Sequence, residues 1–428
     1  MSILIALIIF SALVLFHEFG HFLLARRNGI VVTEFSLGMG PRILSKQIGE
    51  TRYSWKLLPF GGSCAMLGED SETEERGSFN SAPVLGRICV VAAGPVFNFI
   101  LAFLLALIIV GVAGYAPAEV LSVKKGSAAE AAGLQVGDII TEYQGHSIDL
   151  GKDIYVYQYL NHVTEEQLTL KVKRDGVIHT IVYMPDVQVS YLLGLYRESD
   201  VSMRVKSLIP GMALEAAGVK PQDVITSING VDIPDGEAYD AYIREHPLSD
   251  EPVSITYMRA GLTYEAKITP SEYRVPDIGF GYNVGCVKAK NPLEVVKYGL
   301  IETKYMIRTT LMSLRELIHG KIGMEELSGP VGVVDAIGTT YKESRKEGTL
   351  MVWMNMLNMA VMLSANLGVM NLLPIPALDG GRLLFLFLEA LRRKPLNRQV
   401  EGTIHFAGLV LLMAFMVVIM YNDILKIF

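Results

Sequence analysis

The stretch that decides the fold is residues 2–25, SILIALIIFSALVLFHEFGHFLLA, an apolar run interrupted by the sequence His17-Glu18-Phe19-Gly20-His21. As a helix rising 1.5 Å per residue, the run is long enough to cross about 30 Å of hydrocarbon. An ionisable side chain in such a span costs at least ~2.5 kcal/mol near the bilayer centre, so a cluster of them indicates a functional site. The i, i+4 spacing places His17 and His21 on one helix face, where they can share a metal, with Glu18 beside them as a candidate general base.

Three further runs lack Asp, Glu, Lys and Arg, and we expect the four spans at about 2–25, 88–114, 350–373 and 403–422. Hydrophobic residues make up 51% of the 428 residues, charged residues 19%, and mean hydropathy is +0.35, which agrees with a chain partly in lipid. A cleaved signal peptide is the alternative for the first run, but that run lacks a basic start and a small-residue cleavage site.

The distribution of Lys and Arg predicts the topology. Residues 26–87 hold eight of them and residues 379–401 hold five, so both short loops are expected in the cytoplasm. Both termini and the long segment 115–347 then lie on the outer side of the membrane. The net charge of −6, without a basic run, argues against a nucleic-acid partner. The three cysteines are too few and too scattered for a disulfide framework or a thiolate zinc site.

The outer segment contains a duplication. Residues 126–149 align without gaps to residues 211–234 at an offset of 85, with 11 of 24 positions identical. An 85-residue period is the size of a small domain rather than a solenoid unit. Each copy predicts a strand, a short helix ending at Gly133 or Gly218, a second strand after an aspartate, and closing strands at 168–172 and 253–257.

These two copies resemble PDZ domains of the bacterial type. Before the second copy, Leu192-Leu193-Gly194-Leu195 resembles the loop whose backbone N–H groups receive a peptide carboxylate, and no equally good loop precedes the first copy. The alternative is that both domains fill space or hinder access without binding peptides. We expect an N-terminal membrane part at 1–114 with a re-entrant β segment at about 31–67, PDZ-like domains at 115–187 and 188–272, an amphipathic helix and linker at 273–347, and a C-terminal membrane part at 348–428.

A third metal ligand is expected at the end of the third span. Asp379 closes the segment 371–381, NLLPIPALDGG, on the same side of the membrane as the histidines. Its prolines and glycines make regular helix improbable from Pro374 onward. Broken backbone at membrane depth is tolerated where it lines a cavity or is buried in protein. The amphipathic pattern from Asn291 to His319 fits a helix on the outer membrane surface or one packed on the PDZ-like pair, and a structural role is expected for His405.

HEFGH in the first span and NLLPIPALDGG in the third resemble the site-2 protease family of intramembrane zinc metalloproteases, whose signatures are HExxH and N-x-x-P-x-P-x-L-D-G. The resemblance covers nearly the whole chain and is strongest to bacterial members that act on anti-sigma factors. It implies one Zn²⁺ per chain, held by His17, His21 and Asp379, with Glu18 as the base. It also implies substrate-positioning roles, which we assign to Asn371, Gly61, Gly62, Pro374 and Pro376.

The implied fold is a polytopic α-helical membrane protein with four transmembrane helices, a membrane-associated β-hairpin region and two tandem extracytoplasmic PDZ-like α+β domains. The implied activity is regulated intramembrane proteolysis of single-pass membrane proteins in the cell inner membrane. Its partners would be an anti-sigma factor first cut by an upstream extracytoplasmic protease, remnant signal peptides and the lipid bilayer. Two alternatives remain: a catalytically inactive PDZ scaffold, although all four site residues are present, and a metal carrier, although the other spans offer no chain of polar residues.

Overall fold

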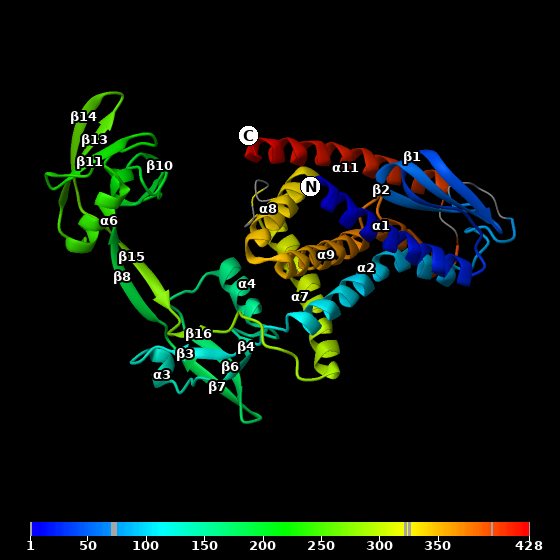
Figure 1. Ribbon diagram of the computed structural model, residues 1–428, viewed down its shortest axis with the longest axis horizontal. Coiled ribbons are helices and arrows are strands. Elements are labelled where there is room, and N and C mark those ends of the chain that lie inside the picture. The colour runs from blue at the N-terminus through cyan, green and yellow to red at the C-terminus, as the bar shows by residue number, and fades with distance from the viewer. Residues whose placement is uncertain (1, 70–74, 321–322, 324–326, 395–396, 428) are drawn as a thin grey trace. The chain divides into compact units, whose positions relative to one another are not determined.

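The computed structural model describes residues 2–69, 75–320, 323, 327–394 and 397–427, and it divides into two compact units (Figure 1). Unit 1 comprises Met1–Pro117, Asp149–Val156 and Val284–Phe428. Unit 2 comprises Ala118–Ile148 and Tyr157–Asn283. The helical regions at the two ends of the chain therefore fold together, and the duplicated region forms the other unit.

Within the described residues, four helices of unit 1 are long and apolar enough to cross a membrane. They confirm the four predicted spans, with ends that differ by a few residues. Each is apolar over most of its length, so its side chains are compatible with a lipid surround while its backbone hydrogen bonds close internally. The four helices are α1 (Ser2–Arg27), α2 (Val84–Val112), α9 (Thr349–Leu372) and α11 (Arg398–Ile427).

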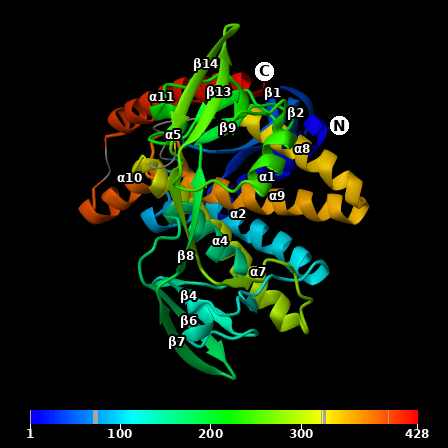
Figure 2. The ribbon, with the colours of Figure 1, turned by 90° about the vertical axis from the view of Figure 1, so that its left-hand side faces the viewer.

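Helix α2 packs against four other helices of unit 1, namely α1, α7 (Pro292–Ile318), α9 and α10 (Asp379–Arg392) (Figures 1 and 2). Small residues bring the backbones close together. A Cβ added at Gly20 of α1 would lie 2.5 Å from the carbonyl oxygen of Ala93 on α2. Likewise, a Cβ at Gly368 of α9 would lie 2.6 Å from the ring of Phe99. These contacts fix α1 and α9 against α2 with little room for rearrangement.

A long hairpin follows α1, as expected for residues 31–67. Its strands are β1 (Val32–Ile48) and β2 (Thr51–Met66). Residues 34–37 pair twice, with residues 62–65 on one side and with residues 52–55 on the other, so the hairpin folds back on itself. Residues 62–66 consequently form an edge of this sheet. Several large apolar side chains near the tip are exposed, namely Ile43, Leu44, Trp55, Leu57 and Leu58.

Three more helices complete unit 1. They are α7 (Pro292–Ile318), α8 (Pro330–Glu347) and α10 (Asp379–Arg392). The predicted amphipathic helix is confirmed as α7, which follows the N-cap Asn291. Its packing differs from both expected locations, because it lies mainly against α2 and α9 of unit 1 rather than on the PDZ-like pair. Helix α10 lies where the sequence suggested a loop. Its apolar and polar residues alternate with helical periodicity, and its buried Leu383 and Leu386 pack into the cluster that α1, the hairpin and α2 share.

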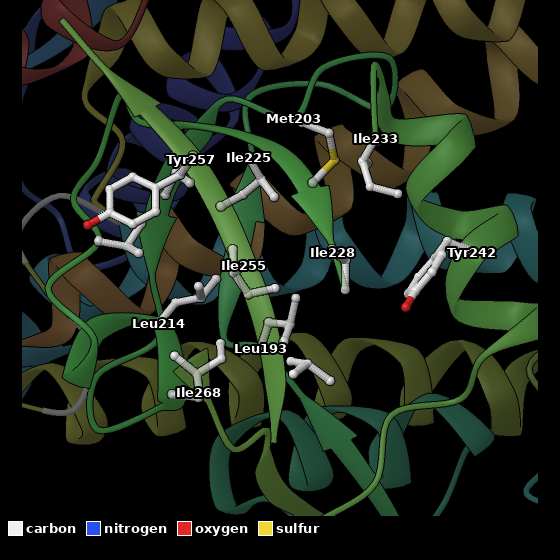
Figure 3. Packing of buried hydrophobic residues seen from close by; sticks show 14 residues of the cluster. Leu193, Met203, Leu214, Ile225, Ile228, Ile233, Tyr242, Ile255, Tyr257 and Ile268 are labelled. Carbon is white, nitrogen blue, oxygen red and sulfur yellow. The ribbon is translucent and has the colours of Figure 1, made fainter. Parts of the chain in front are cut away.

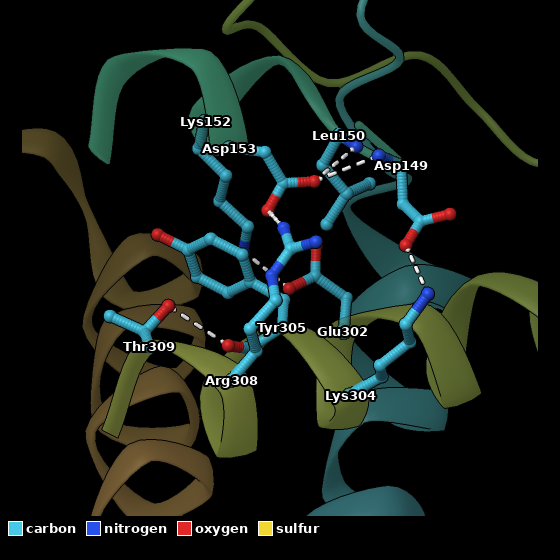
Figure 4. A network of polar contacts seen from close by, with 9 residues as sticks. All are labelled: Asp149, Leu150, Lys152, Asp153, Glu302, Lys304, Tyr305, Arg308 and Thr309. Atoms are coloured by element: carbon cyan, nitrogen blue, oxygen red, sulfur yellow. Dashed lines mark hydrogen bonds and ion pairs between the residues drawn. The ribbon is translucent and has the colours of Figure 1, made fainter. Parts of the chain in front are cut away.

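The first residues of α4 (Gly151–Asn161) belong to unit 1 and contact α7 through charged side chains (Figure 4). The carboxylate of Asp153, 1% exposed, accepts the backbone N–H groups of Asp149 and Leu150 at 2.9 Å each. Its other oxygen pairs with Arg308 of α7. The flanking ion pairs, also to α7, are Asp149 with Lys304 at 2.6 Å and Lys152 with Glu302.

Most of the two predicted copies lies in unit 2, with Asp149–Val156 of the first copy in unit 1, and their sheets and short helices correspond one to one. The first has the sheet order β5-β4-β6-β7, and the second has the order β12-β11-β13-β14. The predicted short helices are α3 (Ala128–Ala131) and α5 (Ala213–Ala216). The strands are β4 (Ile139–Tyr143), β5 (His146–Ser147), β6 (Leu168–Arg174) and β7 (Val177–Tyr183), and β11 (Val224–Ile228), β12 (Val231–Asp232), β13 (Val253–Arg259) and β14 (Leu262–Ile268).

The copies exchange strands in a way that the sequence did not predict. After β7, strand β8 (Asp186–Leu192) pairs with β15 (Ser271–Asp277), its equivalent at the offset of 85. Strand β9 (Leu195–Arg197) then pairs with β10 (Val205–Leu208) at the start of the second copy. Its equivalent β16 (Phe280–Tyr282) returns to pair with β3 (Val120–Val123) at the start of the first copy.

The domain boundaries expected at 187/188 and 272/273 therefore differ from the strand pairing. Residues 273–282, expected to begin a linker, contain most of β15 and all of β16, and β16 completes the first copy. The physical reason is the need to pair strand edges: without β16, β3 would present unpaired backbone groups. Proximity along the chain therefore does not define each copy.

The second copy has a compact apolar core (Figure 3). Leu214, Ile225 and Ile255 have no exposed surface, and they come from α5, β11 and β13 respectively. Leu193, 1% exposed, joins them from the segment before β9. The predicted carboxylate-type loop is therefore anchored in this core by its second leucine.

Candidate metal centre

Three side chains that the sequence singled out converge in unit 1. Nε2 of His17 and Nε2 of His21, both on α1, lie 3.2 Å apart. Oδ2 of Asp379, the first residue of α10, lies 3.1 Å from Nε2 of His17 and 3.5 Å from Nε2 of His21. Both histidines are buried, at 7% and 8% exposed. The structure therefore brings together three potential metal ligands that are separated by up to 362 residues in the sequence.

Their geometry fits a tetrahedral metal ion. Bonds of about 2.0–2.1 Å from zinc to nitrogen or oxygen place neighbouring ligand atoms about 3.3–3.4 Å apart. The three observed separations bracket that value. In addition, Oδ2 of Asp379 is buried and accepts no hydrogen bond of good geometry from the described residues, although nitrogen atoms lie nearby. A buried carboxylate oxygen without a hydrogen-bond partner, next to two imidazole nitrogens, suits a shared cation.

The backbone between α9 and α10 presents Asp379. Helix α9 ends at Leu372 because Pro374 cannot continue it, which confirms the predicted break. Gly380 allows the chain to turn immediately into α10: a Cβ there would lie 2.1 Å from the carbonyl oxygen of Leu373. Before the aspartate, Ala377 has a left-handed φ of 74°. Its N–H donates to Nδ1 of His405 on α11 at 2.9 Å.

His405 therefore has a partner that the sequence did not reveal. The contact ties the segment that carries Asp379 to α11. One turn further along α11, a Cβ at Gly408 would lie 2.4 Å from Cβ of Pro376, so the helix and the segment touch closely. The two residues are 28 positions apart, with α10 between them. Such a contact has no periodic signature, which explains why sequence reasoning missed it.

Glu18 lies beside the two histidines and faces the hairpin. It is close enough to His17, His21 and Asp379 to interact with all three electrostatically. On the hairpin side, a Cβ added at Gly62 of β2 would lie 3.4 Å from Cγ of Glu18. The edge of the sheet at residues 62–66 is thus next to the candidate base.

Helix α2 supplies contacts to the other ring nitrogens of both histidines, and sequence reasoning missed these as well. Nδ1 of His21 lies 2.8 Å from the carbonyl oxygen of Val90. Nδ1 of His17 lies 3.0 Å from Nδ2 of Asn98, which has no exposed surface. Between them, Gly94 lets the helix approach: a Cβ there would lie 2.3 Å from Nε2 of His21. Gly94 and Asn98 are both buried on α2.

The remaining predicted site residues lie at three places. Gly61 and Gly62 are on β2, and Gly62 is brought next to Glu18. Asn371 is in the last turn of α9, and Pro374 and Pro376 follow it on the segment that leads to Asp379. Their roles in positioning a substrate stay predictions.

The predicted loop Leu192-Leu193-Gly194-Leu195 lies between β8 and β9. Gly194 has a φ of 89°, and its carbonyl oxygen accepts the N–H of Ile209 at 3.0 Å. The equivalent loop of the first copy is Ile278-Gly279-Phe280, where Gly279 has a φ of 75° and accepts from Lys124 at 2.8 Å. It follows the second copy in the sequence, so a search before the first copy could not find it. Adding the offset of 85 to Gly194 would have located Gly279.

Comparison with known proteins places these features in a family. The model of Peptidase family M50 matches residues 5–415. Zinc metalloprotease RasP of Geobacillus kaustophilus is 33% identical over 446 residues, covering 100% of this chain and 98% of that protein. Regulator of sigma-W protease RasP of Bacillus subtilis is 32% identical over 448 residues, covering 100% and 99%. A putative zinc metalloprotease of Vibrio cholerae is 28% identical over 457 residues, covering 97% of each chain.

The match spans both membrane parts and the duplicated region, and the relatives are covered almost end to end. The match is therefore not confined to one shared domain. The chain belongs to Peptidase family M50, the site-2 protease family, and is a zinc metalloprotease of the membrane.

Proposed function

We propose that the protein cuts single-pass membrane proteins within their membrane segments, at a zinc ion held by His17, His21 and Asp379. The observation that carries the proposal is the convergence of three ligand atoms on α1 and α10, with α1 itself one of the apolar helices. A hydrolytic site inside such a helix is accessible to a peptide bond that lies in the bilayer and not to soluble proteins in general.

The chain's own residues would share the work as follows. Zinc, when bound, supplies a Lewis acid that polarises the scissile carbonyl and lowers the pKa of bound water to about 7. Glu18, next to both histidines, takes a proton from the attacking water and passes it to the leaving amine. Glu18 directly follows His17 in α1, so the helix itself fixes the position of Glu18 relative to His17.

The hairpin is suited to hold the substrate in an extended form. Among the described residues, 62–66 have a strand partner on one side only, and Gly62 adjoins Glu18. A substrate segment that pairs with this edge would place its peptide bonds beside the base. The glycines at 61 and 62 leave space for the added strand, and Asn371, Pro374 and Pro376 would position it on the way to Asp379. Extension is needed because a helical peptide bond is shielded by its own hydrogen bonds and side chains.

For the substrate, we infer an anti-sigma factor that a different protease has first trimmed on the outer side, with remnant signal peptides as a second class. One relative is named a regulator of a sigma-W factor. The Lys and Arg distribution supports cytoplasmic loops at 26–87 and 379–401, with both termini and the duplicated region on the outer side of the cell inner membrane.

We further propose that the two copies of unit 2 are PDZ-like domains that filter substrates. In this role they exclude membrane proteins that still carry large outer domains. The matching sheet orders and the left-handed glycines at 194 and 279 support a common PDZ-like scaffold. Binding of a peptide to either copy would distinguish recognition by these domains from exclusion by their bulk alone, and an inactive PDZ scaffold is kept as one outcome of the cleavage test.

The test compares wild type with Glu18→Gln in detergent, using a single-span substrate without its outer domain and measuring bound zinc in both. Glu343→Gln, the same change on the exposed surface of α8, is the matched control. Loss of cleavage in Glu18→Gln with about one zinc retained supports both assignments. A wild type that holds zinc and cuts nothing favours the scaffold. Undiminished zinc in His17→Ala would remove the metal assignment.

A further inference from the structure

Helix α2 contacts Nδ1 of both candidate ligands on α1, His17 and His21, and the two contacts differ in kind. This inference rests on the proposed role of His17 and His21 as zinc ligands. An imidazole that binds a metal through Nε2 must carry its hydrogen on Nδ1, and that hydrogen needs an acceptor. The identity of the group that faces Nδ1 therefore decides whether a histidine is ready to bind.

His21 faces an unambiguous acceptor. The group 2.8 Å from its Nδ1 is the main-chain carbonyl oxygen of Val90, which cannot donate. Nδ1 of His21 must therefore carry the hydrogen, so in the neutral imidazole that binds a metal Nε2 is bare, and it lies 3.5 Å from Oδ2 of Asp379. Because a helix carbonyl provides this contact, substitution of the Val90 side chain would leave it in place.

His17 faces a group that can act in either sense. The Asn98 amide places Nδ2 3.0 Å from Nδ1 of His17, while its Oδ1 is buried and has no hydrogen-bond partner among the described residues. The oxygen and nitrogen of an amide are assigned from the surrounding hydrogen bonds. With the nitrogen toward the ring, Nδ1 would be an acceptor and Nε2 would carry the hydrogen, which is incompatible with metal binding at Nε2.

Rotation of the amide about its last bond exchanges the two atoms. The carbonyl oxygen then accepts the Nδ1 hydrogen of His17, and both Nε2 atoms are bare. Two bare nitrogens only 3.2 Å apart repel unless a cation lies between them. The arrangement with Oδ1 toward His17 is therefore the one that suits a bound metal.

We propose that Asn98 is a positioning residue for the metal centre, accepting the Nδ1 hydrogen of zinc-bound His17 through its side-chain oxygen. Its main-chain carbonyl oxygen is engaged separately from the side-chain amide, accepting from Oγ of Ser364 on α9 at 2.7 Å. It has no exposed surface, so water does not compete for the contact. Asn98 thus supplies the hydrogen-bond acceptor for Nδ1 of His17, as the main-chain carbonyl of Val90 supplies it for Nδ1 of His21.

The experiment measures zinc affinity of the full-length protein in detergent by competition with a chelator. It also records the absorption spectrum of the cobalt-substituted protein, which reports ligand geometry without requiring activity. Asn98→Leu keeps the volume and removes the acceptor, and we expect a loss of about 10- to 100-fold in zinc affinity. Asn98→Asp keeps an acceptor oxygen, and we expect zinc affinity no weaker than wild type and an unchanged cobalt spectrum.

Ser364→Ala is the matched control, since it removes a buried hydroxyl that touches the same residue but leaves the amide in place. We expect wild-type zinc affinity for it. Wild-type affinity in Asn98→Leu, or an equal loss in Asn98→Asp and Asn98→Leu, overturns the proposal. His17→Ala separates the two ideas: if it binds zinc like wild type, the metal site itself is misassigned, whereas if it loses zinc while Asn98→Leu does not, only the role of Asn98 fails.

Discussion

The two copies of unit 2 share a scaffold and differ at the loop where their strand exchange begins. In each copy an aspartate just before a strand pairs with the arginine at the end of the neighbouring strand. Asp138, before β4, pairs with Arg174 of β6, and Asp223, before β11, pairs with Arg259 of β13. Each arginine also donates to the glycine that ends the short helix, Gly133 or Gly218, at 2.8 Å. Duplication has thus preserved a buried polar network atom for atom.

At the loop, the copies have diverged. In the first copy, Oδ1 of Asp277 accepts the N–H of Gly279 at 2.9 Å, and its Oδ2 bonds Lys124 at 2.8 Å. The second copy has Leu192 and Ile209 at the equivalent positions, so an apolar pair replaces the ion pair. In the first copy, the Asp277 carboxylate therefore accepts the N–H of the loop glycine, Gly279. In the second copy, the equivalent position is Leu192, which has no carboxylate.

The difference teaches that the duplicated scaffold and the loop chemistry are under separate constraints. The network that fixes the sheet is retained, because a buried aspartate without its partner is costly. The residues around the loop can change, because the loop itself needs only a left-handed glycine. Equivalent substitutions in the two copies test whether the scaffold and the loop are constrained separately.

The largest effect is expected where the loop glycines are replaced. In Gly194→Ala, the left-handed φ and a Cβ 2.3 Å from Cβ of Met212 should destabilise the second copy by about 2–5 kcal/mol. In Gly279→Ala, the nearest atoms are 3.0 Å away on Ser127, so about 1–3 kcal/mol is expected for the first copy. Hydrogen exchange of β11 and β4 measures the two effects, and an equal or reversed order contradicts this account.

The shared network predicts equal responses of the two copies to loss of the aspartate. Asp138→Ala and Asp223→Ala each remove the arginine contacts and one backbone N–H contact, from Gln135 or Lys220. Charged hydrogen bonds of this kind are worth about 1.5–3 kcal/mol, so each copy should lose about that much stability. Exchange rates of the affected sheet report the loss. A clearly unequal pair would show that the networks have diverged in energy although their geometry has not.

Acid should loosen the first loop and leave the second comparatively unaffected. The hydrogen bond from Lys124, followed by the one from the Gly279 N–H, holds the pKa of Asp277 below its usual range. A carboxyl group with a lowered pKa stabilises the fold above its unfolded pKa of about 3.9, and that contribution is lost as pH falls through the folded pKa. Protection of the Gly279 amide, corrected for the intrinsic exchange rate, should therefore decline below about pH 4. Asp277→Asn should abolish the pH dependence, and an equal decline at Gly194 would refute it.

Sequence reasoning recovered those parts of the molecule that have a period or a local motif. The four spans, the break after Leu372, helix α7 and the duplication all have such signatures. It also nominated the three side chains that converge on one point, because HExxH and the proline-rich segment are each local. It missed contacts made between distant segments, as with Asn98 to His17 and Ala377 to His405. In the duplicated region it missed β16, since strand exchange obeys pairing across the fold and not order along the chain.

The smallest effect is expected from exchanging the loop residues themselves. Asp277→Leu removes a partly exposed ion pair, with Lys124 55% exposed, so the stability of the first copy should fall by only about 0.2–1 kcal/mol. Its consequence is chemical: the Gly279 N–H is freed, as Leu192 leaves it free in the second copy. If the PDZ-like reading holds, a peptide with a free carboxylate binds the second copy of the wild type, and Asp277→Leu adds binding at the first. Leu192→Asp should remove binding from the second copy. Crosslinking of a labelled peptide to each copy in the full-length protein measures both, and binding that ignores the two exchanges would mean that the loops act by shape alone.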